Sequence, residues 1–127
     1  KMMQDTLKKL RFKGDGMIIH APNDLVGAFL EEGCKTAFDQ TPSANTLVFV
    51  SNKDELLHFL NTGLQQIIPD SVFWMAYPKG TSKLKSNINR DSIRMTAEEF
   101  GITTVSAISI DETWSALRFR PVDKVGK

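Results

Sequence analysis

The chain has 127 residues, of which 41% are hydrophobic and 24% are charged, as in one compact globular domain rather than a disordered or fibrous protein. No apolar run approaches the roughly 20 residues that a membrane-spanning helix needs. The formal net charge of +1 disfavours a large nucleic-acid surface.

The N-terminal third predicts a helix, a strand and a second helix. Apolar residues spaced three to four apart in 3–12 indicate a short amphipathic helix. GMIIHAP, residues 16–22, is the first strand candidate. NDLVGAFLEEG, residues 23–33, is typical of a helix that Asn23 caps and Gly33 ends.

The middle of the chain predicts a strand followed by a long helix. After a polar connection, TLVFVS (46–51) has the continuous apolar, β-branched pattern of a strand covered on both faces. Asn52, with a glutamate three residues later, resembles a capping box. The apolar stripe that follows continues to Ile67 and Ile68, so we expect the helix to end at Pro69.

The C-terminal half predicts a third strand at 71–78, a helix at 91–101, and strands at 105–110 and 114–121. The short turn between the last two strands indicates an antiparallel hairpin at the sheet edge. The order β-α-β-α-β-α-β-β predicts a three-layer α/β domain with a mostly parallel sheet and right-handed crossovers.

In such folds, ligands tend to bind beyond the carboxyl ends of the strands. These ends carry HAPND (20–24), VSNKD (50–54), YPKGTSK (77–83) and IDETW (110–114). We therefore expect the functional face to lie there.

A basic loop occupies one of these ends. Residues 79–94 hold five basic residues and one acidic residue, a net of +4, whereas the rest of the chain carries −3. The loop lacks the spacing of a phosphate-binding P-loop, but it leads into a helix N-terminus, which favours anions. A small anion is one interpretation and a mobile, solvated loop is the other. The candidate ligand-binding residues are Tyr77, Lys79, Gly80, Thr81, Ser82, Lys83 and Arg90.

The closing hairpin supplies further candidates. Alternation places Trp114 and Arg118 on one face of the last strand, which we expect to be the less buried face. An exposed Trp beside Arg would form a stacking platform, and the alternative is a Trp packed under a helix. Asp111 in the turn is a candidate partner for the arginines or a base, and His20 is the only neutral base expected at the strand ends.

Two resemblances add to this reading. Residues 46–80, TLVFVSNKDELLHFLNTGLQQIIPDSVFWMAYPKG, resemble the middle of a class I, Rossmann-like S-adenosylmethionine methyltransferase domain. That resemblance implies the strand order 1-2-3-5-4 with strand 5 antiparallel. MIIHAPND, FWMAYPKGTSKLKSNINRD and IDETWSALRFRP are similar to a family of small bacterial domains without an established activity, over roughly residues 7–121.

Methyl transfer itself is not expected. A class I methyltransferase needs a glycine-rich turn after its first strand, where the backbone passes close to the cofactor. Here Ala21, Pro22 and Asn23 stand in that turn, and proline also removes a backbone donor. The resemblance therefore points to a degenerate relative that holds no cofactor.

We thus expect one domain over residues 1–127, bacterial, cytoplasmic and non-catalytic, that binds a small anionic ligand or a partner. We expect no metal site, because two His and one Cys show no clustered spacing, and no nucleic-acid or membrane partner. Two alternatives remain open. One is an enzyme for a phosphorylated or carboxylated small molecule, with His20 or Asp111 as base. The other is a self-associating module, a homodimer that uses Trp114 and Arg118.

Overall fold

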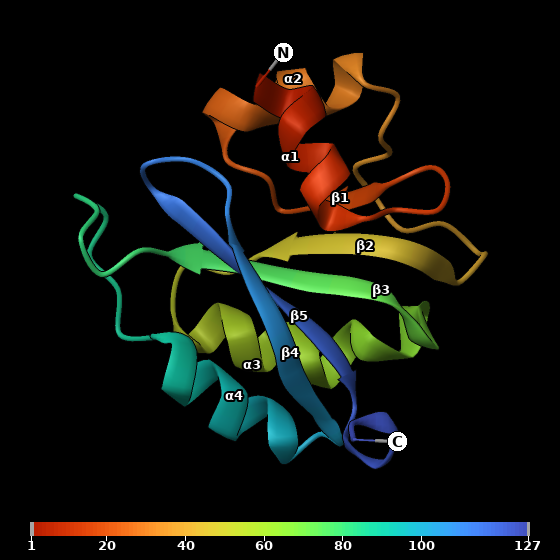
Figure 1. Ribbon diagram of the computed structural model, residues 1–127, viewed down its shortest axis with the longest axis vertical. Helices are drawn as coiled ribbons and strands as arrows, with labels where there is room; N and C mark the ends of the chain where they lie inside the picture. Colours follow the sequence, from red (N-terminus) through yellow and green to blue (C-terminus); the bar gives the residue numbers. More distant parts are fainter. Residues whose placement is uncertain (1, 127) are drawn as a thin grey trace.

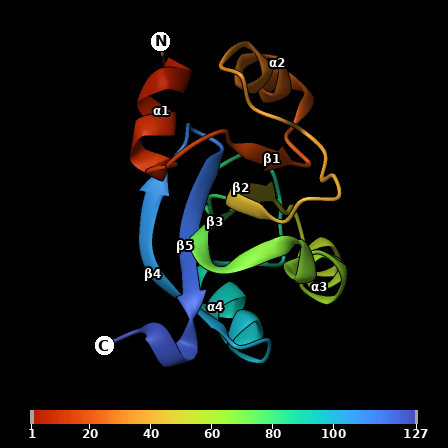
Figure 2. The ribbon, with the colours of Figure 1, turned by 90° about the vertical axis from the view of Figure 1, so that its right-hand side faces the viewer.

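The computed structural model describes residues 2–126, so both end residues of the expected 1–127 domain lie outside it. Two pairs of helices enclose one sheet (Figures 1 and 2). The helices are α1 (Met2–Leu10), α2 (Asn23–Glu31), α3 (Lys53–Thr62) and α4 (Arg90–Glu98). The strands are β1 (Met17–Ile19), β2 (Ser43–Phe49), β3 (Ile67–Pro78), β4 (Ile102–Ser109) and β5 (Trp114–Pro121).

The sheet has the order β1-β2-β3-β5-β4, which confirms the expected order. The pairs β1–β2 and β2–β3 are parallel, whereas β3–β5 and β5–β4 are antiparallel. The expectation of a mostly parallel sheet is therefore inexact. Strand β5 runs opposite to the other strands and lies between two of them, so half of the pairings become antiparallel.

Apolar side chains fill both faces of the sheet. Along β3, Phe73 and Met75 pack toward α3 and α4, while Trp74 and Ala76 pack toward α1 and α2. The same alternation runs along β2 and β5. Helices thus cover both faces of the central strands, which explains the continuous apolar runs in their sequence.

The third helix is shorter than its apolar stripe predicts. It ends at Thr62, a 3-10 turn follows over Leu64–Gln66, and Ile67 already belongs to β3. The expected helix end at Pro69 is therefore wrong. Gly63 is the C-cap residue of α3, and its N–H still makes the last helical bond, to the Phe59 carbonyl. A side chain at this position would collide with the Phe59 ring.

The ends of α2 show one wrong and one confirmed prediction. Pro22, not Asn23, takes the N-cap position, and no side chain caps this helix. Gly33 does end it, with φ at +86°. The N–H groups of Gly33 and Cys34 bond to the carbonyls of Leu30 and Phe29, at 3.0 and 3.1 Å, which closes the helix in a Schellman motif.

None of the described helices combines the length and the apolar character needed to cross a bilayer.

Candidate functional site

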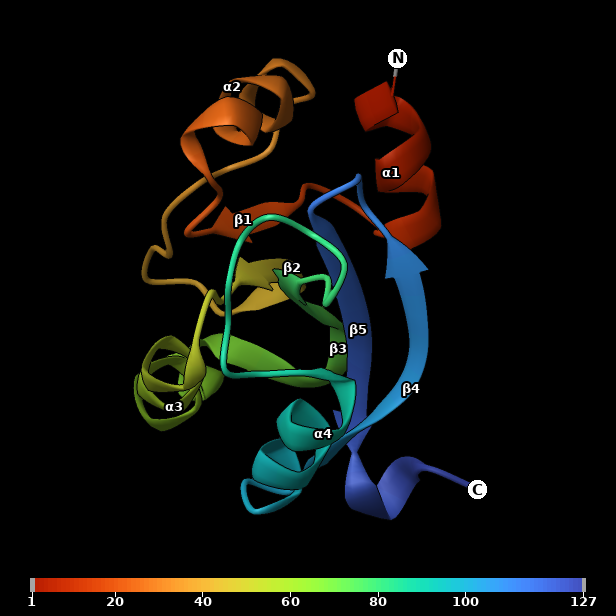
Figure 3. The same cartoon turned by 90° about the vertical axis from the view of Figure 1, so that its left-hand side faces the viewer.

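The carboxyl ends of β1, β2 and β3 lie along one edge of the sheet. The basic loop, here residues 79–89, leaves β3 at this edge and enters α4. In Figure 3 it arches in front of the strand ends. Two hydrogen bonds place it beside the end of β2, because Ser86 Oγ donates to the Ser51 carbonyl at 2.7 Å and the Lys53 N–H donates to Asn87 Oδ1 at 2.9 Å.

The loop is also fixed at its start and at its end. The Lys79 N–H donates to the Thr113 carbonyl at 2.8 Å, which ties it to the start of β5. Ser82 donates from both its N–H and its hydroxyl to the Lys79 carbonyl, at 3.0 and 2.8 Å. At the other end, Asn89 and Ser92 form a reciprocal capping box on α4. The loop is therefore an anchored connection, and Ser82 is occupied within it.

The charged side chains of the loop fall into two groups. Lys79 turns toward β4, and its Nζ donates to Ser109 Oγ at 2.6 Å. Lys83, Lys85 and Arg90 are exposed, and none of them forms an ion pair within residues 2–126. Gly80 and Thr81 are exposed as well, with open space above the Gly80 Cα.

Tyr77 and Arg90 lie near each other on the α4 side of the sheet. Burial raises the pKa of the Tyr77 phenol, and the positive charge of Arg90 opposes that rise. Asp91 forms its ion pair with Arg94, at 3.9 Å, rather than with Arg90. Arg90 therefore has no carboxylate partner among the described residues.

A hollow of about 520 Å³ beside Lys79 is more acidic than basic. Three carboxylates and one ammonium line it, from Asp24, Asp111, Glu112 and Lys79 together with Ser109 and Thr113. This balance disfavours an anion. Lys79 is thus the least suited of the loop cations to an anion site.

Asp111 has a structural role in the hairpin. Its Oδ1 accepts hydrogen bonds from the backbone N–H groups of Thr113 and Trp114, both at 2.8 Å. The carboxylate closes the turn between β4 and β5 in the manner of an Asx turn. The predicted pairing with an arginine is wrong, because within the described residues Arg120 bonds to Asp70 and Arg118 forms no ion pair.

The turn after β1 does not fit S-adenosylmethionine. His20, exposed and with φ at +61°, makes the turn that a glycine makes in a glycine-rich loop. A glycine-rich turn has no side chain between its backbone and the cofactor, whereas His20 and Ala21 each carry one here. Pro22 offers no N–H group at the start of α2.

Trp114 is buried in the core, so the interpretation as a packed tryptophan is confirmed and the alternative of a stacking platform is wrong. Only 5% of Trp114 is exposed, and its ring meets the Phe49 ring edge-on with centroids 5.0 Å apart. On the face that we expected to be less buried, Trp114 and Ala116 pack with side chains of α1 and α2, whereas Arg118 is half-buried. A homodimer that uses Trp114 and Arg118 would therefore have no exposed tryptophan at its interface.

Arg118 lies in a different group of residues. It faces Trp74 of β3 and Ser106 of β4 across the sheet, and with them it lines a hollow beside the end of α1. The sequence analysis missed the other cations of this hollow, Lys8, Lys9 and Arg11. The run KKLRFK at 8–13 was the signal that could have indicated them.

The remaining titratable candidates form no catalytic cluster. Cys34 is buried, and that burial, helped by Glu32 and Asp15, raises the pKa of its thiol. His58 is exposed on α3. Within residues 2–126, no three His, Cys, Asp or Glu side chains gather in a group that could hold a metal ion.

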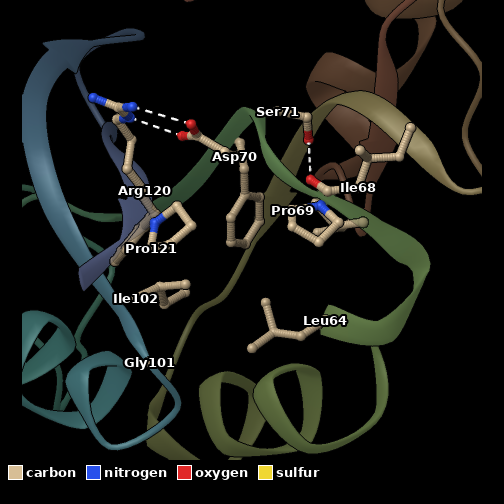
Figure 4. A pocket seen from close by; sticks show the side chains of 12 residues that line it. Leu64, Ile68, Pro69, Asp70, Ser71, Gly101, Ile102, Arg120 and Pro121 are labelled. Carbon is tan, nitrogen blue, oxygen red and sulfur yellow. Dashed lines mark hydrogen bonds and ion pairs between the residues drawn. The ribbon is translucent and has the colours of Figure 1, made fainter. Parts of the chain in front are cut away.

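An apolar hollow of about 220 Å³ lies at the opposite edge of the sheet, at the start of β3 (Figure 4). Leu64, Pro69 and Ile102 contribute to its wall. At its rim, Arg120 donates to both carboxylate oxygens of Asp70, at 2.8 and 3.0 Å.

This ion pair predicts a pH dependence. Asparagine at position 70 tolerates the local φ of +59° but removes the charge. The hydrogen bonds from Arg120 hold the pKa of the Asp70 carboxyl below its ordinary value of 3.8. The stabilisation is therefore complete above that value and is lost as the pH falls through the lower folded-state pKa. We expect wild type to exceed Asp70→Asn in unfolding free energy at neutral pH, and the difference to disappear in acid. Urea unfolding across pH measures this, and a pH-independent difference would contradict it.

The comparisons with known proteins support the fold. A crystal structure of a SAM-dependent methyltransferase from Aquifex aeolicus is similar to this chain with a TM-score of 0.53. The match covers 91% of this chain and 87% of that chain at 11% sequence identity. No protein-family model and no curated protein matches the chain. The fold is therefore methyltransferase-like and Rossmann-like, and at this identity the likeness extends to the fold alone.

Proposed function

We propose that this protein is a non-catalytic domain that binds a small anionic ligand under the basic loop, at the carboxyl ends of β2 and β3. The observation that supports the proposal is an anchored loop whose cations Lys83, Lys85 and Arg90 are exposed and unpaired within the described residues 2–126. An anchored cationic loop loses less conformational entropy on binding than a mobile one.

The neighbouring groups favour an anion on the α4 side of the loop. Asp91 is engaged by Arg94, so it does not neutralise Arg90. The positive end of the α4 dipole lies at Arg90, the first residue of the helix. The ordinary pKa of a tyrosine phenol, 10.0, already keeps Tyr77 protonated at neutral pH, and burial raises it further, so the phenol can donate to an oxyanion.

The likeness to a methyltransferase does not extend to catalysis in this proposal. The turn after β1 does not fit the cofactor, and Asp111, one of the two candidate bases, closes a hairpin. The ligand is instead a small phosphate, sulfate or carboxylate compound. Contacts to Lys83, Arg90, Tyr77 and the backbone of Gly80 and Thr81 would hold it.

Substitution of the loop cations tests this proposal. We expect phosphate or sulfate to stabilise the protein thermally, and Lys83→Ala with Arg90→Ala to weaken binding about tenfold, since each exposed charged contact contributes about 0.5–1 kcal/mol. Differential scanning fluorimetry at constant ionic strength measures the shift against anion concentration.

The matched control removes two cations elsewhere. Lys35→Ala with Lys124→Ala lowers the net charge equally, so its anion dependence should stay that of wild type. If both double variants lost anion binding equally, the effect would come from net charge alone, and the proposed site would be wrong. Lys79→Ala alone should change the anion dependence little, because Lys79 lines the acidic hollow and not the proposed anion site.

A further inference from the structure

A second basic surface lies on the other side of the sheet, between the end of α1 and the β4–β5 pair. In Figures 2 and 3, the C-terminal end of α1 lies beside the arrowhead of β4. The hollow there has a volume of about 460 Å³. We call it the cationic groove, lined by Lys8, Lys9, Arg11, Trp74, Ser106 and Arg118, with Ile108 at its edge.

The floor of the groove is a row of side chains across neighbouring strands. Arg118 of β5 stands in register with Trp74 of β3 on one side and with Ser106 of β4 on the other. The pairing of β4 shifts between Thr104 and Ser106, so a β-bulge lies directly beside Arg118. Bulges re-aim neighbouring side chains and are common beside binding sites.

The end of α1 is fixed over this floor. Trp74 Nε1 donates to the Leu10 carbonyl at 2.8 Å, in a buried contact. This hydrogen bond holds the last turn of α1, from which Lys8, Lys9 and the following Arg11 extend. The α1 dipole opposes an anion here, but Trp74 and the Arg11 N–H occupy the Leu10 and Lys8 carbonyls.

Arg118 has a buried donor without an acceptor. Its Nε is inaccessible to solvent and makes no hydrogen bond within the described residues. A guanidinium stays charged at any pH that proteins tolerate, and an unsatisfied buried donor is rare and costly. An oxyanion in the groove would supply the missing acceptor once the guanidinium turns toward it, because Nε is shielded from solvent in the unliganded arrangement.

The described part of the chain supplies little negative charge to the groove. No carboxylate lines it, and Lys8, Lys9, Arg11 and Arg118 form no ion pairs within residues 2–126. Asp70 is close enough for Arg118 to lower its pKa slightly, but Arg120 already holds both Asp70 oxygens.

We propose that the cationic groove binds a small phosphate-type oxyanion, either inorganic phosphate or a phosphate monoester. The Arg118 guanidinium turns toward the anion and donates from Nε, the Ser106 hydroxyl offers a further donor, and the α1 cations supply charge. A single buried donor and a chain net charge of +1 suit a small anion better than a nucleic-acid track. This site is independent of the proposed loop site, which lies on the α4 side of the sheet.

The most direct test follows the Arg118 side chain itself. In ¹H–¹⁵N spectra, we expect the Arg118 Nε–H resonance to shift saturably on addition of inorganic phosphate at ionic strength held with chloride. Phenyl phosphate should compete for the same site. The shift should persist in the Lys83→Ala, Arg90→Ala double variant, which separates this proposal from the loop site. An unshifted Arg118 resonance across the titration would overturn the groove. So would saturation by a short single-stranded oligonucleotide but not by phosphate.

Thermal unfolding of Arg118→Met separates binding from a structural role. Methionine keeps an apolar stem of similar shape and removes the unpaired donor. Without phosphate, we expect its Tm to equal or exceed that of wild type, and the phosphate-dependent rise contributed by the groove, about 3–5 °C at tenfold excess over Kd, to disappear. Arg118→Lys keeps the charge but not Nε, so it should retain only part of the rise. A lower Tm for Arg118→Met with an unchanged phosphate response would assign Arg118 a structural role and overturn the proposal.

Discussion

Truncation of Trp114 to alanine is expected to lower the free energy of unfolding by about 3–5 kcal/mol, the range for large aromatic side chains removed from a core. The Trp114 ring is 5% exposed and packs edge-on against Phe49, which packs edge-on against Phe29 of α2 at 6.1 Å. These rings join the start of β5 to β2 and α2. Because a domain of this size is stable by only about 5–15 kcal/mol, this one change removes a large fraction of its stability. Urea unfolding followed by tryptophan fluorescence and circular dichroism measures it.

Trp114→Phe is the matched control. It keeps a ring that can still meet Phe49 and should lose less than half as much stability. If Trp114 were a surface platform for self-association, the alanine variant would instead keep its stability, and light scattering would show a smaller assembly than for wild type. That outcome would contradict the buried position.

The sequence predicted the order of elements because each strand has its own apolar pattern. The cap signal at Asn52 located the start of α3, because its side chain accepts from the Glu55 N–H at 2.9 Å, whereas the cap expected at Asn23 was wrong. The boundary between α3 and β3 was missed for a physical reason. Ile67 and Ile68 continue the helical apolar period, but Gly63 ends the helix and Ile67 pairs with Ser43 of β2.

Pro69 of β3 was interpreted as the end of a helix, because proline interrupts helices. The strand accommodates Pro69 at an irregularity. Its pairing with β2 jumps from Ile67 to Val72, and Asp70 adopts a positive φ of 59°. Only the paired structure reveals that the chain is extended on both sides of this break.

The position of the basic loop was predictable from the sequence, but the roles of its residues were not. The strand expected at 71–78 and the helix expected at 91–101 leave a loop between them, and the structure has this loop at residues 79–89. The hydrogen bonds give several predicted ligand-binding residues a structural role instead. Ser82 and Asp111 bond to backbone groups, and Lys79 donates to Ser109. Arg118 and the α1 cations are more than 100 residues apart in the sequence, and only the cross-strand register unites them.

Replacement of Trp74 by alanine should also lower the free energy of unfolding by about 3–5 kcal/mol. Trp74 is 2% exposed, and its Nε1 is the donor for the buried Leu10 carbonyl. Trp74→Phe restores most of the apolar volume but leaves that carbonyl unsatisfied, at a cost of about 1–3 kcal/mol. The phenylalanine variant therefore isolates the hydrogen bond that fixes α1. Chemical denaturation gives both values.

The consequence for the cationic groove follows from the same bond. Without it, the end of α1 is free to separate from the sheet, so Trp74→Phe should speed hydrogen exchange of the α1 amides and weaken phosphate binding at Arg118. Phe73→Leu is the matched control, because Phe73 lies on the same strand but packs toward α3 and α4. It should lose stability without altering α1 exchange or groove affinity. If both variants changed α1 equally, the coupling would come from general destabilisation and not from the Trp74–Leu10 hydrogen bond.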